Sequence, residues 1–390
     1  MHDHGSEVVG LGPLPPRVRG WLFAVLLPFI GATLVGLVLL WPPQDRVEGT
    51  DRFTATKVTG EVVALLDCPR GFPADCVRGE VELSDGGDVV EAGLPYGENT
   101  PQVDVGDRVV LAYAPQAPPG QQYVWYDFDR SSTMLALVVV FALAVVFLSR
   151  WQGVGSLIGL AISLGVVFLF VLPAIAHGED PIIVAVTGAA LIMTLVLYIS
   201  HGINAMTSVA LVGTLAALAL TAVLGLVFTD LARFTGLSDD SNRILLQVLP
   251  HVEFEGVLLA GLIIGALGVL DDVTVTQAAA VWELTDADPE APPRTIFASA
   301  MRIGRAHVAA TVNTLVLAYT GAALPLLLSY SAVEANLIEV GLSDGVATEL
   351  MRGMVGSLGI IAAVPITTLV GVAVASAIVT RQRQPTPPIG

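Results

Sequence analysis

The chain has 390 residues, of which 54% are hydrophobic and 14% are charged. A typical soluble domain carries about 25% charged residues, so this composition excludes an ordinary soluble globular protein and an acidic disordered one. The net charge of −17 argues against nucleic acid as a partner, because nucleic acids attract basic surfaces. We therefore expect an integral membrane protein whose main surroundings are the lipid bilayer.

Apolar segments long enough to cross about 30 Å of hydrocarbon, which takes roughly 20 helical residues, recur along the chain. They cover residues 21–41, 132–149, 153–175, 181–199, 204–228, 256–283, 306–328 and 354–379. The first begins and ends with Trp and has no small-residue cleavage site, so we expect a retained helix and not a signal peptide. The predicted fold is an α-helical polytopic membrane protein with about eight transmembrane helices.

The positions of Arg orient these segments, because basic residues gather on the cytoplasmic side of membrane proteins. With eight crossings, one side receives Arg17, Arg19, Arg150, Arg294, Arg302, Arg305, Arg381 and Arg383. We predict cytoplasmic tails at 1–20 and 380–390, a first transmembrane helix at 21–41 and a seven-helix bundle at 131–379. The only lysine is Lys57, a preference for Arg that is typical of a GC-rich bacterial genome, so we place the chain in the bacterial inner (cytoplasmic) membrane.

Residues 42–130 have a different composition, with frequent charges and short alternating runs at Phe53–Leu66, Val77–Leu83 and Arg108–Tyr113. Gly, Asp and Pro separate these runs, as they separate strands in small β domains. We predict an extracytoplasmic β domain of OB-like or barrel-sandwich type. Under this topology the acidic charge of the chain lies on the outer face, which favours cations over anions there.

Both cysteines, Cys68 and Cys76, lie in this β domain. Extracytoplasmic space permits disulfides, and two cysteines that close a short loop suit one, although two free thiols are the alternative. The domain has no His to complete a zinc site, so we predict neither a metal nor a cofactor.

The segment 256–283 contains an Asp pair, Asp271 and Asp272, after only fifteen apolar residues. In one interpretation the helix stops at the pair, which then lies in cytoplasmic water. In the other, the helix continues to Trp282, and the pair lies about 15 Å inside it, near the middle of the bilayer.

Helical spacing favours the second interpretation. Gly261, Gly265, Gly268, Asp272, Thr276 and Ala279 recur at steps of three and four, so they share a helix face that begins with a Gly-xxx-Gly contact motif. We expect Asp272 to point into the bundle, where a carboxylate is a candidate functional group because its burial in lipid is costly. Asp271 lies about 100° round the helix, and an adjacent pair suits proton uptake or cation binding.

The following span supplies candidate partners for Asp272. Asn313 lies eight residues beyond Arg305, about 12 Å along a helix and at the expected depth of the Asp pair. Its amide suits donation to Asp272 or joint binding of an ion; a hydrogen bond that only stabilises helix packing is the alternative. Tyr319 lies in the same span, and we count it with Asp271, Asp272, Thr276 and Asn313 as a candidate substrate or ion-binding residue.

Three segments resemble the YibE/F family of bacterial multispan membrane proteins. They are Gly268–Val273 with its continuation through Trp282–Leu284, Ile303–Arg305, and Asn313–Gly321. The resemblance extends over most of the chain after about residue 130. It implies that Asp272 and the run from Asn313 to Tyr319 are family features, whereas Asp271 stands where an apolar residue is usual. It implies a membrane protein often presumed to be a transporter, without a defined substrate.

These observations give a leading hypothesis of a secondary permease or channel-like transporter for a small solute or ion, with Asp272 as a proton or cation site. The alternative is an envelope scaffold or receptor whose outer β domain binds a partner while the bundle is an anchor. A homo-oligomer or a partner membrane protein is compatible with either. We predict no enzymatic activity, because aspartyl catalysis needs carboxylates that face each other across a gap and the chain has no P-loop or nucleophile elbow.

Overall fold

The computed structural model describes residues 14–43, 56–67, 76–95, 97, 99–118, 120–237, 245–332 and 336–382. The chain forms two compact units. One comprises Arg46–Gly153, and the other comprises Met1–Asp45 together with Val154–Gly390.

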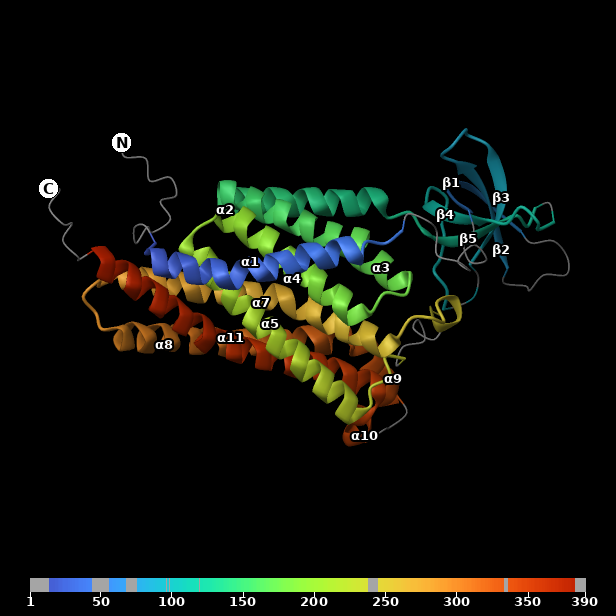
Figure 1. Ribbon diagram of the computed structural model, residues 1–390. Coiled ribbons are helices and arrows are strands. Elements are labelled where there is room, and N and C mark those ends of the chain that lie inside the picture. Colours follow the sequence, from blue (N-terminus) through green and yellow to red (C-terminus); the bar gives the residue numbers. More distant parts are fainter. Residues whose placement is uncertain are drawn as a thin grey trace. The chain divides into compact units, whose positions relative to one another are not determined.

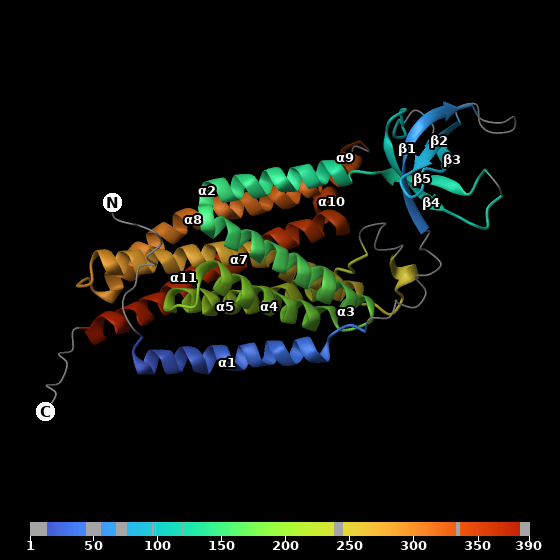
Figure 2. The same cartoon turned by 90° about the horizontal axis from the view of Figure 1, so that it is seen from above.

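Long apolar helices make up the larger unit and run side by side in both views (Figures 1 and 2). Its elements are the second part of α2 (Ser131–Val166), η2 (Val167–Val171), α3 (Leu172–Ala176), α1 (Pro16–Leu39), α4 (Pro181–His201), α5 (Ala205–Ala232), α7 (Phe254–Ala287), α8 (Pro293–Ala322), α9 (Leu324–Ala332), α10 (Leu337–Leu342) and α11 (Asp344–Gln382). Helices of this kind satisfy every backbone group internally, which is what a membrane interior requires.

Within the described residues, six helices are long and apolar enough to span a membrane, or seven if the pair α8 and Leu324–Tyr330, bent by 61°, is one span. The polytopic membrane class is therefore supported, but the predicted count of eight is not confirmed. The difference lies in Ser131–Ala176, a 46-residue candidate span that contains two of the predicted segments. Arg150, where the sequence predicts a turn, has the non-helical dihedrals φ 51° and ψ −129°.

The helices of the larger unit alternate in direction. Arg381 Nη1 at the end of α11 donates to the carbonyl oxygen of Leu14 at 2.9 Å, just before α1 begins. The same end contains a buried cluster from the starts of α5 and α8 and the end of α7, including Val209, Ile296 and Trp282. The start of α1 and the end of α11 therefore lie at one end of this unit, as Figure 1 shows.

The part of α2 that belongs to this unit runs the length of the bundle. The position of a Cβ on Gly155 lies 3.7 Å from Ser200 Cα, near the end of α4. Beyond α3, the carbonyl oxygen of Ala176 lies 3.0 Å from His251 Nε2, just before α7. Residues 154–176 thus extend from one end of the unit to the other.

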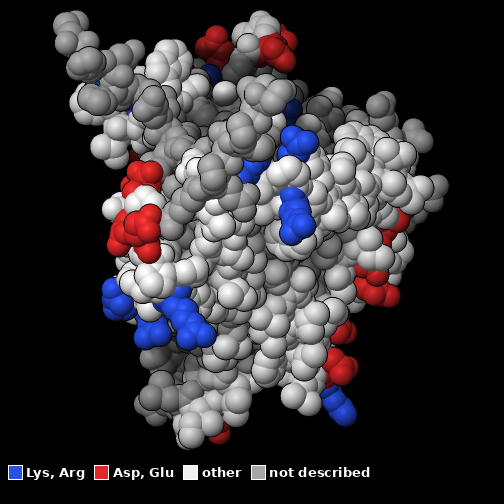
Figure 3. Space-filling model, turned by 60° about the vertical axis from the view of Figure 1, so that its left-hand side comes forward, with Lys and Arg blue, Asp and Glu red and all other residues white. Residues whose placement is uncertain are grey.

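The outward surface of the helices is largely apolar. Figure 3 shows broad uncharged areas on one face, with Lys, Arg, Asp and Glu gathered in small groups. Large exposed apolar side chains occur on most of the helices, for example Leu39, Phe147, Leu231 and Leu369. Such a surface suits contact with lipid tails and would be unfavourable in water.

The smaller unit contains a closed five-stranded barrel of β1 (Thr56–Leu66), β2 (Val77–Leu83), β3 (Val89–Leu94), β4 (Arg108–Tyr113) and β5 (Tyr123–Phe128). The strand order is β1-β2-β3-β5-β4. The pairs are antiparallel except β3 with β5, which is parallel. Alternate residues such as Val62, Val81 and Leu111 fill the interior. The predicted small barrel is confirmed, and a five-stranded barrel is the architecture of OB folds.

The predicted Cys68–Cys76 disulfide falls partly outside the described residues. Cys68 lies outside the described residues, whereas Cys76 directly precedes β2. The Cys68–Cys76 bond therefore stays a prediction.

Candidate functional site

The Asp pair lies in the middle of one continuous helix. α7 runs from Phe254 to Ala287, so Asp271 lies about 25 Å from either end at 1.5 Å per residue. The interpretation in which the helix stops at the pair is wrong. Two carboxylates therefore occupy the centre of a helix whose other residues are mostly apolar.

The face of α7 predicted from its spacing exists, but other helices of the unit cover it only in part. Gly261, Gly265, Gly268, Asp272 and Thr276 are exposed, while the residues between them are mostly buried. The side chain of Asp272 is 66% exposed, so the expectation that it points into the bundle is wrong. The reason is that the large apolar side chains on the other sides of α7 bury more area against α4, α5 and α11 than glycines can.

The partner of Asp272 on α8 is His307. Its Nε2 atom lies 3.6 Å from Asp272 Oδ2, and its side chain is 38% exposed. This distance allows an ion pair but is too long for a direct hydrogen bond. The site thus joins an acid and a base across the contact of α7 with α8.

Asn313 does not take the predicted role. It lies on an exposed face of α8, six residues and about 9 Å beyond His307 along the helix. The spacing of the residues around the connection between α7 and α8 would have indicated His307 as the neighbour of Asp272. α7 ends at Ala287 and α8 begins at Pro293, so residues equally far from this short connection lie side by side. Asp272 lies 15 residues before the end of α7, and His307 lies 14 residues after the start of α8.

Asp271 is more enclosed than Asp272. Its Oδ1 atom is buried and has no hydrogen-bond partner among the described residues. An unpartnered buried carboxylate oxygen is costly unless the group binds a proton or a cation. Thr276 does not provide this contact, because its hydroxyl donates to the backbone oxygens of Asp272 at 2.7 Å and Val273 at 3.1 Å.

Tyr319 of α8 packs against the same glycine face of α7, nearer to the start of α7 than Asp272. A Cβ on Gly265 would lie 3.0 Å from the Tyr319 hydroxyl, and one on Gly261 would lie 3.8 Å from Arg352 Nη2. The glycines therefore make room for these two polar side chains. Gly265 precedes Asp272 by seven residues, about 10 Å along α7, so Tyr319 belongs to a neighbouring site and not to the carboxylates.

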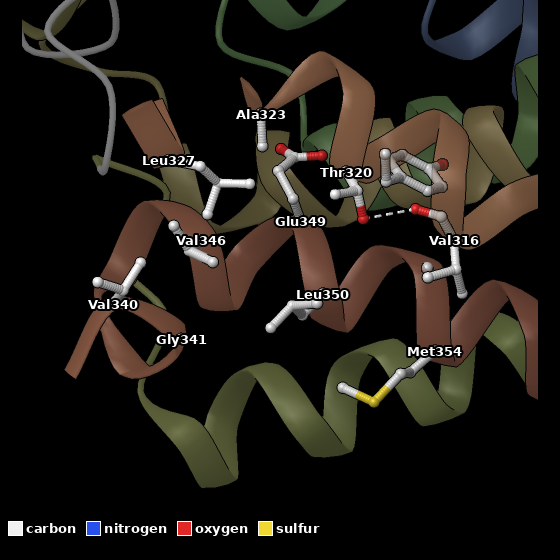
Figure 4. Close-up of a pocket in the computed structure, with 12 residues that line it drawn as sticks. Val316, Thr320, Ala323, Leu327, Val340, Gly341, Val346, Glu349, Leu350 and Met354 are labelled. Carbon is white, nitrogen blue, oxygen red and sulfur yellow. Dashed lines mark hydrogen bonds between the residues drawn. The ribbon is translucent and has the colours of Figure 1, made fainter. Parts of the chain in front are cut away.

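A cavity of about 250 Å³ adjoins Tyr319. α8, α9, α10 and α11 form its walls (Figure 4), and its lining residues are Val316, Tyr319, Thr320, Ala323, Leu327, Val340, Gly341, Val346, Glu349, Leu350, Gly353 and Met354. Thr320 donates its hydroxyl to the Val316 carbonyl at 2.8 Å. The carboxylate of Glu349 is therefore the one anionic group in an otherwise mostly apolar lining.

An ion pair supports this wall of the cavity. Glu349 Oε1 lies 3.2 Å from Arg352 Nη1, one turn further along α11, and both side chains are about three-quarters buried. The predicted span begins only at residue 354, so the apolar pattern leaves Arg352 outside the membrane and does not indicate the pair. The i,i+3 spacing of opposite charges at the start of a helix is the signal that indicates it.

Gln277 is a further polar residue that the sequence analysis missed. It is buried on α7, and its Nε2 atom donates to the Ala300 carbonyl at 3.0 Å and to Thr368 Oγ1 at 2.6 Å. These bonds link α7 to α8 and α11. Gln277 therefore holds α8 and α11 against α7, the helix that carries the Asp pair.

The apolar helices and the polar groups at their centre define an α-helical membrane protein of the polytopic class, with a separate small barrel. The chain belongs to the family of YibE/F-like proteins, whose family model matches residues 137–377. The family predicted from the sequence is thus confirmed. Comparisons with curated proteins and with solved structures gave no match.

Proposed function

We propose that the chain is a secondary permease or channel-like transporter for a small solute or ion, in which Asp272 and His307 form a proton or cation site. The observation that carries this proposal is the 3.6 Å approach of the two side chains at the centre of an apolar helix pair. Ionisable groups at such depth are costly and typically mark proton or ion pathways. An acid and an imidazole at this distance need only a small approach to form a direct hydrogen bond, along which a proton can pass.

Two further observations support transport. The buried oxygen of Asp271 adds a second carboxylate beside the first, which favours a cation or a proton over an anion. The cavity near Tyr319 offers a space of about 250 Å³, which suits a small solute. We assign no catalytic reaction to these residues, since neighbouring carboxylates on one helix diverge.

We propose further that Ser131–Ala176 makes two crossings, with the turn at Arg150. This gives eight crossings, cytoplasmic termini and an extracytoplasmic barrel in a bacterial inner membrane. The supporting observations are that residues 154–176 already run the length of the bundle and that the non-helical Arg150 precedes them. Arg17, Arg294 and Arg381 then lie on the side that the positive-inside rule requires.

The test is transport or proton movement in proteoliposomes. Replacement of Asp272 by Asn removes the charge at nearly constant volume, and we expect a loss of at least tenfold in coupled flux. Asp286→Asn is the matched control, because Asp286 is an exposed carboxylate near the end of the same helix. Unchanged flux in Asp272→Asn would remove the proposed site.

The scaffold or receptor alternative rests on the barrel, which folds as part of a separate unit. Under that hypothesis, deletion of residues 45–128 abolishes function while Asp272→Asn does not. Under the transporter hypothesis, Asp272→Asn abolishes function while deletion of residues 45–128 does not.

A further inference from the structure

Two grooves flank the first half of α1. The groove between α1 and α11 has a volume of about 330 Å³, with Arg17, Val18 and Trp21 on one wall and Leu369, Val370, Ala373 and Val374 on the other. The groove between α1 and the α4–α5 corner has a volume of about 220 Å³ and is lined by Leu14, Arg19, Leu22, Phe23, Leu26, Leu27, Ile30, Tyr198, Ile203, Asn204 and Ser208. α1 is therefore held away from the bundle on both sides of its first turns.

Each groove is apolar and has one Arg near the start of α1. Neither Arg17 nor Arg19 has an ion pair among the described residues, although the chain carries a net charge of −17. Trp21 follows Arg17 by one turn on the same helix face and borders the same groove. A Trp beside an Arg at the end of a spanning helix is typical of the membrane–water interface.

The apolar walls and the unpaired charges point to one occupant. We propose that anionic phospholipids fill the two grooves, with acyl chains against the apolar walls and phosphate groups on Arg17 and Arg19. Basic pockets between transmembrane helices bind anionic headgroups, because the charge selects the headgroup while the groove holds the chain. The occupied grooves join α1 to α11 and to α4, so the lipid stabilises the helix bundle.

The test uses the full chain in a neutral detergent and measures its unfolding temperature with added lipid. We expect phosphatidylglycerol to raise this temperature by about 4 °C or more at saturation, and phosphatidylcholine with the same acyl chains to have a much smaller effect. Equal shifts with both lipids would overturn the proposal. Inorganic phosphate distinguishes the sources of the anion: a full shift with phosphate alone would mean a free-anion site and not a lipid site.

Variants locate the lipid. The double variant Arg17→Gln/Arg19→Gln should weaken phosphatidylglycerol binding about tenfold, whereas Arg294→Gln, at the same end of the bundle and outside both grooves, should not. Ala373→Leu keeps every charge but narrows the first groove, and it should also weaken binding. If Arg294→Gln weakens binding as much as the double variant, or Ala373→Leu has no effect, the lipid is attracted by surface charge alone and the grooves are not its site.

Discussion

His307 gives Asp272 a basic neighbour at 3.6 Å. A base this close to a carboxylate offsets part of the cost of holding the carboxylate among apolar helices. The pair is therefore the residue-scale feature on which the proposed function depends.

Replacement of His307 by Asn removes the base beside Asp272 while it keeps a polar side chain of smaller size. Under the proposed function we expect coupled flux to fall about tenfold or more. The measurement is flux in proteoliposomes. Asn313→Ala on the exposed face of the same helix is the control and should keep the parent flux; a His307→Asn variant with unchanged flux would show that His307 takes no part in transport.

The hydrogen bonds of Gln277 to α8 and α11 should contribute to the stability of the helix bundle. Gln277→Leu leaves Thr368 without its donor on α7 and removes the bond to Ala300, so we expect destabilisation of about 1–3 kcal/mol. The measurement is reversible unfolding in mixed micelles. Thr276→Val is the control, because its exposed hydroxyl bonds only to its own helix, and it should change stability by less than about 0.5 kcal/mol. Equal effects of the two substitutions would contradict the role assigned to Gln277.

For single residues, the sequence predicts which side chains are chemically important better than it predicts which side chains they contact. A carboxylate inside an apolar helix is visible from Asp272 and its neighbours alone. Its contact with His307 depends on how α8 packs along α7. Counting residues from Arg305 predicted Asn313 as the neighbour of Asp272, which is six residues, about 9 Å, too far along α8. Glu349 and Arg352 were missed for a related reason: the apolar pattern starts only at residue 354, just after them, although α11 begins at Asp344.

Close contacts between helices depend on glycines opposite threonines. Gly213 on α5 lies against Thr367 on α11, and Gly359 on α11 lies against Thr221 on α5. This reciprocal pair of contacts allows the two backbones to approach closely, as small residues do in membrane bundles. α5 and α11 are thereby held together on the side of the bundle that supports α7.

A side chain at Gly213 should separate these helices. Because a Cβ at this position overlaps Thr367, we expect Gly213→Val to destabilise the bundle by about 1–3 kcal/mol through overpacking. Gly268→Ala is the control, since its Cβ meets nothing within 4 Å. Thermal unfolding of both variants is the measurement, and a Gly213→Val protein as stable as the control would contradict the close packing.

The junction of β5 with α2 contains a charged pair that precedes the candidate span Ser131–Ala176. Arg130 Nη1 donates to Asp127 Oδ2 at 2.8 Å, and this bond holds the pKa of the Asp127 carboxyl below its ordinary value of 3.8. A lowered pKa means that the pair stabilises the folded junction above about pH 3.8 and that this contribution is lost as the pH falls further. Protonation of Asp127 also weakens the bond that its carboxylate accepts from the Phe128 amide at 2.8 Å.

Hydrogen exchange of the Phe128 amide, which donates to Asp127 Oδ1, measures this effect. After correction for intrinsic rates, we expect protection to be constant between about pH 5 and 7 and to fall below about pH 3.8. Arg130→Gln should shift the loss toward higher pH, because the group that lowers the pKa is gone. An Arg130→Gln junction with the same acid response as the parent would exclude the ion pair as its cause.

Helices and strands with strong periodicity were the predictable elements. The ranges Val77–Leu83 and Arg108–Tyr113 were found exactly as β2 and β4, and the uninterrupted helix through the Asp pair followed from its spacing. The 61° bend after α8 was not predicted, since the apolar pattern of 306–328 continues across it. Hydropathy indicates whether a segment is apolar enough to lie in lipid, but it carries little information about where the helix axis bends.

For the whole molecule, the number of crossings decides which face carries the barrel. Between the barrel and the connection of α7 with α8, the predicted segments make five crossings. If Ser131–Ala176 crosses once and not twice, the same stretch makes four. An odd number places the two regions on opposite sides of the membrane, and an even number places them on the same side.

Cysteine labelling distinguishes the two numbers. In a chain with Cys68 and Cys76 replaced by Ser, a reporter at Ser84 lies in the turn after β2, and one at Asp288 lies just beyond α7; both positions are exposed. With two crossings in Ser131–Ala176, a membrane-impermeant maleimide should label Ser84→Cys in intact cells and Asp288→Cys only after permeabilisation. Labelling of both reporters from the outside would mean a single crossing. In that case the 46 residues of Ser131–Ala176, about 69 Å of helix, would have to fit into a bilayer of about 30 Å. The break at Arg150 relieves this mismatch only if the chain turns back there.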